Sequence, residues 1–230
     1  MKIGGFQKTS LLDYPDKLSA IIWTVGCNYH CPFCYNVGLV KKSTTPLDEQ
    51  EILSFLAQRT KQLEGVVITG GEPLLQEDIL QFTKKIKDMG FLVKIDTNGS
   101  APEVLSELLD QQLVDFVAMD IKAPQEKYPE LTGIITDITA VQQSIDLLMN
   151  SDVDYEFRTT VIPEFLNKDD IVNIAKWVEG AKTYCLQQFK ADTPTLLDSM
   201  TMKTPYEKKV LMEMVEDIKP YVQFVVIRGV

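Results

Sequence analysis

Three of the four cysteines of the chain, Cys27, Cys31 and Cys34, lie within the eleven-residue segment GCNYHCPFCYN, which begins at Gly26. Four cysteines scattered at random over this chain would give the spacing only about once in two thousand arrangements, so chance is a poor explanation. Thiolates bind soft metals and iron-sulfur clusters. In a reducing cytosol, clustered cysteines are more often ligands or redox groups than disulfides.

The number of thiols favours one kind of cofactor over another. A structural zinc site needs four ligands, and here the only addition is His30, which abuts Cys31 and can hardly reach the same ion. Three thiolates suit a cubane iron-sulfur cluster with one iron left open. A disulfide or a group of unliganded thiols is the remaining alternative. Cys185, far away in the sequence, is expected to be a small apolar side chain facing the core.

Composition and charge limit the class of protein. The chain has 230 residues, 45% of them hydrophobic, which is enough for one sizeable domain spanning residues 1–230. Its net charge of −10 repels polyphosphate, so nucleic acid is not an expected partner. No signal peptide is recognisable, and no apolar run is long enough to span a bilayer. The sequence therefore predicts a cytoplasmic protein with no membrane partner.

Short β-branched segments alternate with amphipathic segments along the chain, which predicts an α/β fold with parallel strands. The expected strands are 18–25, 65–69, 91–96, 114–120, 154–161 and 183–189. The expected helices are 48–62, 76–89, 102–111, 137–150 and 168–179, and a last helix and strand follow at 205–218 and 221–227. Polar and glycine-rich segments follow the first four strands, so a partial (β/α)6 barrel would gather them at one rim.

The cysteine segment resembles the signature of the radical S-adenosylmethionine (SAM) superfamily, in which C-x3-C-x2-C follows the first strand and an aromatic residue precedes the last cysteine. The resemblance implies that Cys27, Cys31 and Cys34 hold a 4Fe-4S cluster whose open iron binds SAM. It also implies a 5′-deoxyadenosyl radical that abstracts a hydrogen atom. Phe33 would lie near the adenine, although an aromatic residue of the core is an equally good interpretation.

The segment Thr69-Gly70-Gly71-Glu72-Pro73 matches the GGEP motif of the same superfamily. By this resemblance, backbone carbonyls and the acid bind the SAM amino group, and the glycines permit close approach. On its own the segment could be a simple turn. We expect Gly71→Val to weaken SAM binding without emptying the cluster site, because the cysteines follow a different strand.

The segments around Asp96, Asn98, Asp120 and Lys122 resemble more narrowly those of glycyl-radical-enzyme activating enzymes. There, the matching acids and lysine surround the methionine end of SAM, and the acids are able to share a monovalent cation. The resemblance makes Lys122 an anchor for the SAM carboxylate, and Arg158 matches an arginine of a barrel strand. An ordinary surface ion pair is the alternative for each of these charges.

The first 36 residues, with GFQKTSLLDYP and AIIWTVGC, resemble anaerobic ribonucleoside-triphosphate reductase activating proteins. That family implies hydrogen abstraction from a glycine of a partner glycyl radical enzyme, here anaerobic ribonucleotide reductase, with a flavodoxin- or ferredoxin-type electron donor. Two positions depart from related patterns. Tyr35 replaces a histidine after the third cysteine, and Gln187-Gln188-Phe189 stands where pyruvate formate-lyase activating enzyme has a histidine near SAM.

Two other functions stay open from the sequence. A radical SAM enzyme could act on a small molecule, as 7-carboxy-7-deazaguanine synthase does. The cysteines could also belong to a metal-binding module without enzymatic activity. The chain has no second cysteine cluster, which argues against radical enzymes with auxiliary clusters.

Overall fold

The computed structural model describes residues 1–197, 200 and 203–230 and contains one eight-stranded sheet whose strands stand in chain order. Strands β2 to β8 run parallel, and β1 is antiparallel to β2. The strands are β1 (Ile3–Ser10), β2 (Ser19–Thr24), β3 (Gly65–Gly70), β4 (Leu92–Thr97), β5 (Phe116–Asp120), β6 (Asp154–Val161), β7 (Thr183–Gln188) and β8 (Phe224–Arg228).

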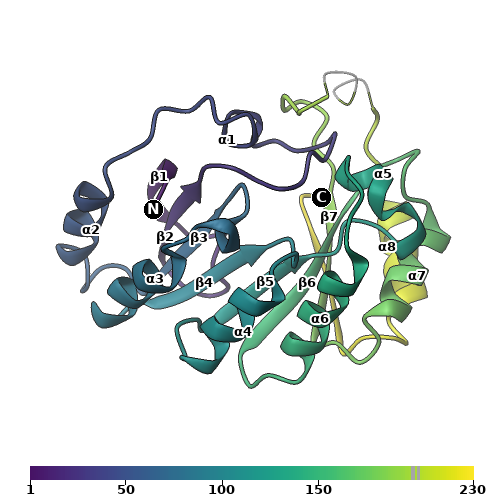
Figure 1. The fold of residues 1–230 in the computed structure, drawn as a ribbon. Coiled ribbons are helices and arrows are strands. Elements are labelled where there is room, and N and C mark those ends of the chain that lie inside the picture. The colour runs from purple at the N-terminus through teal and green to yellow at the C-terminus, as the bar shows by residue number, and fades with distance from the viewer. Residues whose placement is uncertain (198–199, 201–202) are drawn as a thin grey trace.

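Helices cover the outer face of this curved sheet, from α2 beside the first strands to α7 and α8 beside the last (Figure 1). The α-helices are α1 (Val37–Val40), α2 (Glu49–Ala57), α3 (Ile79–Asp88), α4 (Pro102–Asp110), α5 (Tyr128–Thr132), α6 (Ile138–Met149), α7 (Lys168–Trp177) and α8 (Lys208–Ile218). Two short 3-10 helices, η1 (Pro73–Leu75) and η2 (Gln125–Lys127), also lie in the described part of the chain. Among the described residues no helix has both the length and the apolar character needed to cross a membrane.

The alternation of strands and helices predicted from the sequence is confirmed, including the last helix and strand. Strand β1 was not predicted, because its sequence IGGFQKTS has two glycines and an exposed polar stretch in place of a β-branched run. Close packing explains the glycine at position 4. A Cβ on Gly4 would lie 2.5 Å from Leu39 Cδ2, so β1 can lie under α1 only without a side chain there.

The helix boundaries differ from the predicted ones in several places, since α7 also ends at Trp177 and α8 begins at Lys208. The helix predicted for 48–62 ends at Ala57, and short turns lead from there into β3. The helix predicted for 76–89 begins at Ile79, after η1. The expected polar N-terminal caps are present: the Asp48 and Asp137 carboxylates accept backbone N–H groups of the first turn, and Asn167 forms a capping box with Asp170.

Apolar side chains fill two separate regions. The large core lies between the outer face of the sheet and the helices, and it includes Ile68, Phe82 and Phe157. A small cluster of Tyr14, Ile21 and Val67 lies apart from it, and Phe116 packs against this cluster. Because side chains alternate along a strand, residues between those of the large core point to the inner face.

The sheet does not close into a complete barrel. Its order begins with β1 and ends with β8, and within the described residues no strand pairing joins the two. This partial barrel confirms the predicted fold class. The wall of the barrel is therefore open between β1 and β8. The polar segments of the sequence meet at the carboxyl ends of the strands, next to this opening.

Candidate functional site

The cysteine loop follows β2 and is tied to several distant parts of the chain. The N–H of Gly26 donates to Leu39 O at 3.0 Å, and the Glu72 N–H donates to Gly26 O at 2.8 Å. Farther along, the His30 N–H donates to Thr132 O at 2.8 Å, and the Leu196 N–H donates to Cys34 O at 3.0 Å. Backbone hydrogen bonds from four regions therefore hold the loop in place.

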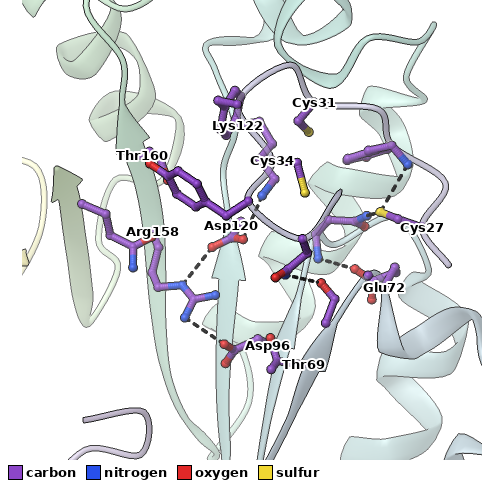
Figure 2. A pocket seen from close by; sticks show the side chains of 18 of the residues that line it. Cys27, Cys31, Cys34, Thr69, Glu72, Asp96, Asp120, Lys122, Arg158 and Thr160 are labelled. Atoms are coloured by element: carbon purple, nitrogen blue, oxygen red, sulfur yellow. Dashed lines mark hydrogen bonds and ion pairs between the residues drawn. The ribbon is translucent and has the colours of Figure 1, made fainter. Parts of the chain in front are cut away.

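A cavity of about 560 Å³ opens under this loop, a size that suits a nucleoside-like ligand. All three cysteines of the loop line it (Figure 2). Most other candidate residues from the sequence line the same cavity, namely Phe33, Gly70, Gly71, Glu72, Asp96, Asn98, Asp120, Lys122 and Arg158. Pro73 does not line it and is buried at the start of η1.

The three thiols are free and lie in a largely buried environment. Burial raises the pKa of the Cys27 thiol to about 11 and that of Cys31 to about 12, so binding of iron there must displace protons. The His30 side chain is exposed and does not line the cavity. Within the described part of the chain, no three His, Cys, Asp or Glu side chains gather closely enough to hold a single metal ion.

Gly70 and Gly71 press against the cysteine loop and the strand before it. A Cβ on Gly71 would lie 1.9 Å from Gly26 O, and one on Gly70 would lie 2.3 Å from Thr24 N. Gly70 also has a positive φ of 122°. The cysteines do follow a different strand, as expected, but Gly71 contacts the cysteine loop at Gly26, so a side chain at Gly71 would also disturb the cluster site.

Glu72 is almost fully buried and connects the ends of β3 and β4. Its carboxylate accepts hydrogen bonds from Asn98 N at 2.7 Å, Thr97 Oγ1 at 2.8 Å and Leu74 N at 3.1 Å. Burial raises the pKa of Glu72 to about 7. Both carboxylate oxygens are thus already engaged within the protein, which makes Glu72 a support for the β4 loop as well as a lining residue.

Asn98 extends this support to the cysteines. Its Nδ2 donates to Asn28 Oδ1 at 3.0 Å and lies 3.8 Å from Cys27 Sγ. Asn28 in turn donates to Ser100 Oγ at 2.8 Å. Asn28 was not among the site residues predicted from the sequence, although its place inside the cysteine segment could have identified it. A polar network therefore runs from Glu72 through Asn98 to the cysteine loop.

The charged residues form a continuous row across the inner face of the sheet. Arg158 Nε donates to Asp120 at 2.8 Å, and its Nη1 donates to Asp96 at 3.1 Å (Figure 2). Lys122 pairs with Asp120 at 2.8 Å, and the Lys94 ammonium pairs with Asp96. These pairs are inside the barrel, so the alternative of ordinary surface pairs is wrong for them.

Burial and pairing act in opposite directions on these groups. Burial alone raises the pKa of Asp96 and of Asp120, but Arg158 and the neighbouring lysines outweigh it, so both carboxylates titrate below their ordinary range. Burial lowers the pKa of Lys122, while Asp120 and the Cys31 thiol raise it by more. Asp96, Asp120 and Lys122 therefore stay ionised at neutral pH and present fixed charges to the cavity.

Several residues of the inner face were missed from the sequence. Lys94 stands two residues before Asp96, and Glu156 two residues before Arg158, so strand alternation could have placed both inside. Arg228 of β8 makes two hydrogen bonds to Glu156, at 2.6 and 2.7 Å. Arg228 also lines the cavity.

Three other positions clarify the sequence predictions. Phe33 lines the cavity and also packs into the large core, so its two interpretations do not exclude each other. Tyr35 stacks on Phe189, and its hydroxyl accepts from Lys190 N at 2.7 Å. Cys185 is buried but lies outside both apolar clusters, near Arg228 and Glu156. It therefore faces the polar interior, in contrast to the apolar surroundings expected for it.

Comparison with known proteins places this site in a family. The model of the Radical SAM superfamily matches residues 21–178, more than half of the chain, and the chain belongs to this superfamily. Superfamily members use a 4Fe-4S cluster and S-adenosylmethionine, and three free thiols beside a polar cavity fit these two cofactors. The chain is thus a radical SAM enzyme.

Individual relatives of the chain have names that are more specific than that of the superfamily. A Methanocaldococcus jannaschii protein named as a glycyl-radical enzyme activating enzyme is 36% identical over 237 aligned residues, covering 99% of this chain and 96% of that protein. A second protein of that organism with the same type of name is 31% identical, covering 77% of this chain and 68% of that protein. A 7-carboxy-7-deazaguanine synthase from Clostridium acetobutylicum is 34% identical, but over 47% of this chain and 48% of that protein.

Among solved structures, a domain of pyruvate-formate lyase-activating enzyme from Bacteroides vulgatus aligns with a TM-score of 0.58. The alignment covers 72% of this chain and 99% of that domain at 17% identity. At this identity the likeness shows the fold alone. It agrees with the partial barrel seen here.

Proposed function

We propose that this protein activates a glycyl radical enzyme, and that its partner is anaerobic ribonucleotide reductase. The observation that carries the proposal is the placement of three thiols and a charged row around one cavity beside the open edge of the barrel. The nearly full-length similarity to a protein named as a glycyl-radical enzyme activating enzyme supports it. The resemblance of the first 36 residues to reductase activating proteins supports the choice of partner.

In this proposal Cys27, Cys31 and Cys34 hold the cluster, and the cavity beside them holds SAM. When bound, the two cofactors supply a 5′-deoxyadenosyl radical that abstracts a hydrogen atom. The cysteine loop fixes the cluster end, since its backbone is bonded to four other regions. The buried position of the loop also keeps water from the reacting groups.

The charged row orients SAM. Lys122 offers a donor to the SAM carboxylate while Asp120 keeps its ammonium ionised. The backbone of Gly70 and Gly71 receives the SAM amino group, and Glu72 and Asn98 hold the neighbouring loops in position. Phe33 packs beside the adenine. Arg158 forms ion pairs with both Asp96 and Asp120. A monovalent cation shared by these two acids stays a prediction.

The substrate in this proposal is one glycine in a loop of a folded protein. Such a loop is large, so it needs an approach wider than a closed barrel gives, and the gap between β1 and β8, which no strand pairing closes among the described residues, provides one. We also propose that residues 1–230 act as a single cytoplasmic domain. Its electrons come from a flavodoxin- or ferredoxin-type donor.

A small-molecule substrate is the second candidate function. Similarity to a 7-carboxy-7-deazaguanine synthase over about half of the chain is the observation that favours it. The two candidates differ in where the abstracted hydrogen originates, since one substrate is a protein backbone and the other is a heterocycle.

The test of the proposed function is anaerobic incubation of the reconstituted, reduced protein with SAM and the reductase, read by electron paramagnetic resonance. A doublet from one coupled α-hydrogen on the reductase is the expected result. If the reductase gains no radical while a deazapurine precursor is turned over, the second candidate takes its place.

A further inference from the structure

Strand β8 ends the sheet and has one free edge. It pairs with β7 in parallel from Phe224 to Arg228, and the Phe224 N–H donates to Lys182 O at 3.0 Å. In a parallel ladder, alternate residues direct their N–H and C=O groups to opposite sides. Val225 and Ile227 therefore direct theirs away from β7, and no partner for them occurs in the described part of the chain.

This edge has only some of the features that usually prevent strand addition: β8 is short and ends in the inward-pointing Arg228, but it contains no lysine, proline or bulge. Natural edge strands carry lysines, prolines or bulges that block pairing. The run from Phe224 to Ile227 is entirely apolar, and its pairing with β7 shows no register shift. Phe224 is 68% exposed, whereas Val225 and Ile227 pack partly against the large core. The outer edge of β8 is thus a regular row of backbone groups open to a further strand.

The edge leads directly into the cavity. Arg228 and Gly229, at the carboxyl end of β8, line the cavity that Cys34 also lines. The two hydrogen bonds from Arg228 to Glu156 fix this end of the strand against β6. A segment paired along β8 would therefore reach the mouth of the cavity in a fixed register.

The opposite side of the opening has related features. Asp13, in the loop between β1 and β2, lines the same cavity. Its neighbours Leu11 and Leu12 are 76% and 89% exposed. Exposed apolar side chains thus occur on the loop that faces the cavity and on β8, as expected for a surface that binds a protein segment.

We propose that the glycine-bearing segment of the protein substrate binds as an added strand on the free edge of β8. This proposal rests on the proposed function. The N–H and C=O groups of Val225 and Ile227 bind the segment backbone, a recognition mode that needs no side chain at the target residue. The segment then passes Arg228 and Gly229, where a glycine brings its Cα closest to the cavity because no Cβ intervenes.

A second copy of this chain fits the edge less well. Two β8 edges paired with each other would cover the opening beside both cavities and leave a protein substrate no approach. The substrate segment satisfies the same backbone groups and delivers its own residue to the site. The choice of occupant therefore follows from the continuity of the edge with the cavity.

The test uses the reconstituted, SAM-loaded full chain and two probes: the full-length anaerobic ribonucleotide reductase of the same organism, and a synthetic peptide of its glycine-bearing segment. Ile227→Pro removes one outward N–H, and Ile227→Val is the matched control that keeps it. We expect Ile227→Pro to lower the rate of glycyl radical formation about tenfold or more. Deoxyadenosine formation without the reductase should stay within about twofold of the unaltered protein, as should both activities of Ile227→Val.

A peptide series on the unaltered protein makes the test independent of how the variant folds. Single N-methylation removes one peptide N–H at a time, and only alternate residues of an added strand bond to β8. Methylation of the alternate peptide residues that face β8 should weaken the peptide's inhibition of reductase activation about tenfold. Methylation of the residues between them should change that inhibition less than about threefold.

The outcomes separate the docking proposal from the proposed function. Normal radical formation by Ile227→Pro, or inhibition that does not depend on which of the two sets of peptide residues is methylated, overturns docking on β8 while the activase function stands. Deoxyadenosine without any glycyl radical on the reductase, in the unaltered protein, overturns the function and the docking together. A stable dimer that Ile227→Pro dissociates would also overturn the docking, since it assigns the edge to a second copy.

Discussion

The two sides of the cavity are built differently. On one side, backbone hydrogen bonds join the cysteine loop to four regions, and the Glu72–Asn98 network also supports it. On the other side, β8 is bonded along one edge only, and its inward charge is held by a single pair, Arg228 with Glu156. The contrast indicates that the cysteine side is fixed in advance, whereas the β8 side, where we propose that the substrate binds, keeps backbone groups available.

The largest expected effect comes from removing a ligand on the fixed side. Cys31→Ala should abolish the iron-sulfur cluster, because three thiols leave no spare ligand for a cubane. Iron and sulfide analysis after anaerobic reconstitution measures this, together with loss of all SAM cleavage. Cys185→Ala is the control and should keep its iron, since Cys185 lies near Glu156 and Arg228, away from the loop. Loss of iron in the control with retention in Cys31→Ala would reverse the assignment.

The next effect tests the contact between the β3 end and the cysteine loop. Gly71→Ala should lower both SAM affinity and the iron content, because a Cβ there would overlap Gly26 O at 1.9 Å. Gly90→Ala controls for a general loss of stability: its φ of 88° strains a side chain, but a Cβ there meets nothing within 4 Å, so iron content and SAM affinity should be unchanged. If Gly71→Ala binds SAM weakly but keeps a full cluster, the fixed side is less rigid than its hydrogen bonds indicate.

A smaller loss is expected from the charged row. Lys122→Ala should weaken SAM binding by about ten- to a hundredfold, in line with about 1.5–3 kcal/mol for a hydrogen bond to a charged group. SAM cleavage and glycyl radical formation should fall together, because both need oriented SAM. Equilibrium binding measured with the reconstituted protein tests this. A variant that cleaves SAM normally but fails to activate the reductase would place Lys122 on the substrate side.

The smallest effect concerns the buried carboxyl of Glu72. Its pKa is raised from 4.5 to about 7 in the folded protein, so the folded state binds the proton more tightly than the unfolded state. The resulting stability is complete below pH 4.5 and is lost as the pH rises through about 7. Urea unfolding of the cofactor-free protein at pH 5 and pH 8 should show a fall of about 1–3 kcal/mol from this group. Glu72→Gln should remove that part of the fall, and an unchanged difference would contradict the shift.

The sequence predicted most of the wall of the barrel. Strands such as Gly65–Gly70 are rich in β-branched residues and bounded by polar segments, so the sequence predicted both that they are strands and where they lie. Strand β1 was not predicted, since its glycines meet their neighbours only in three dimensions: a Cβ at Gly4 would press on Leu39. The short helices α1 and α5 carry too few residues for a periodic signal.

Candidate site residues could be predicted from the sequence where they stood in motifs at the ends of strands. Partnerships between them could not, because the Arg158 contacts to Asp96 and Asp120 join three strands. Gly71 shows the same limit: the motif gave the residue, but only the fold shows that its missing side chain makes room for Gly26 O. Arg228 stands in no motif, and only the folded structure shows that it lies on β8 beside Glu156.

The most direct test of the central claim follows the hydrogen atom. Reductase labelled with deuterium at the α-carbon of its glycines is incubated anaerobically with the reduced protein and SAM, and the 5′-deoxyadenosine is analysed by mass spectrometry. We expect one deuterium in the deoxyadenosine for each glycyl radical formed. Unlabelled deoxyadenosine from the labelled reductase, with deuterium arriving instead from a labelled small molecule, would contradict the account.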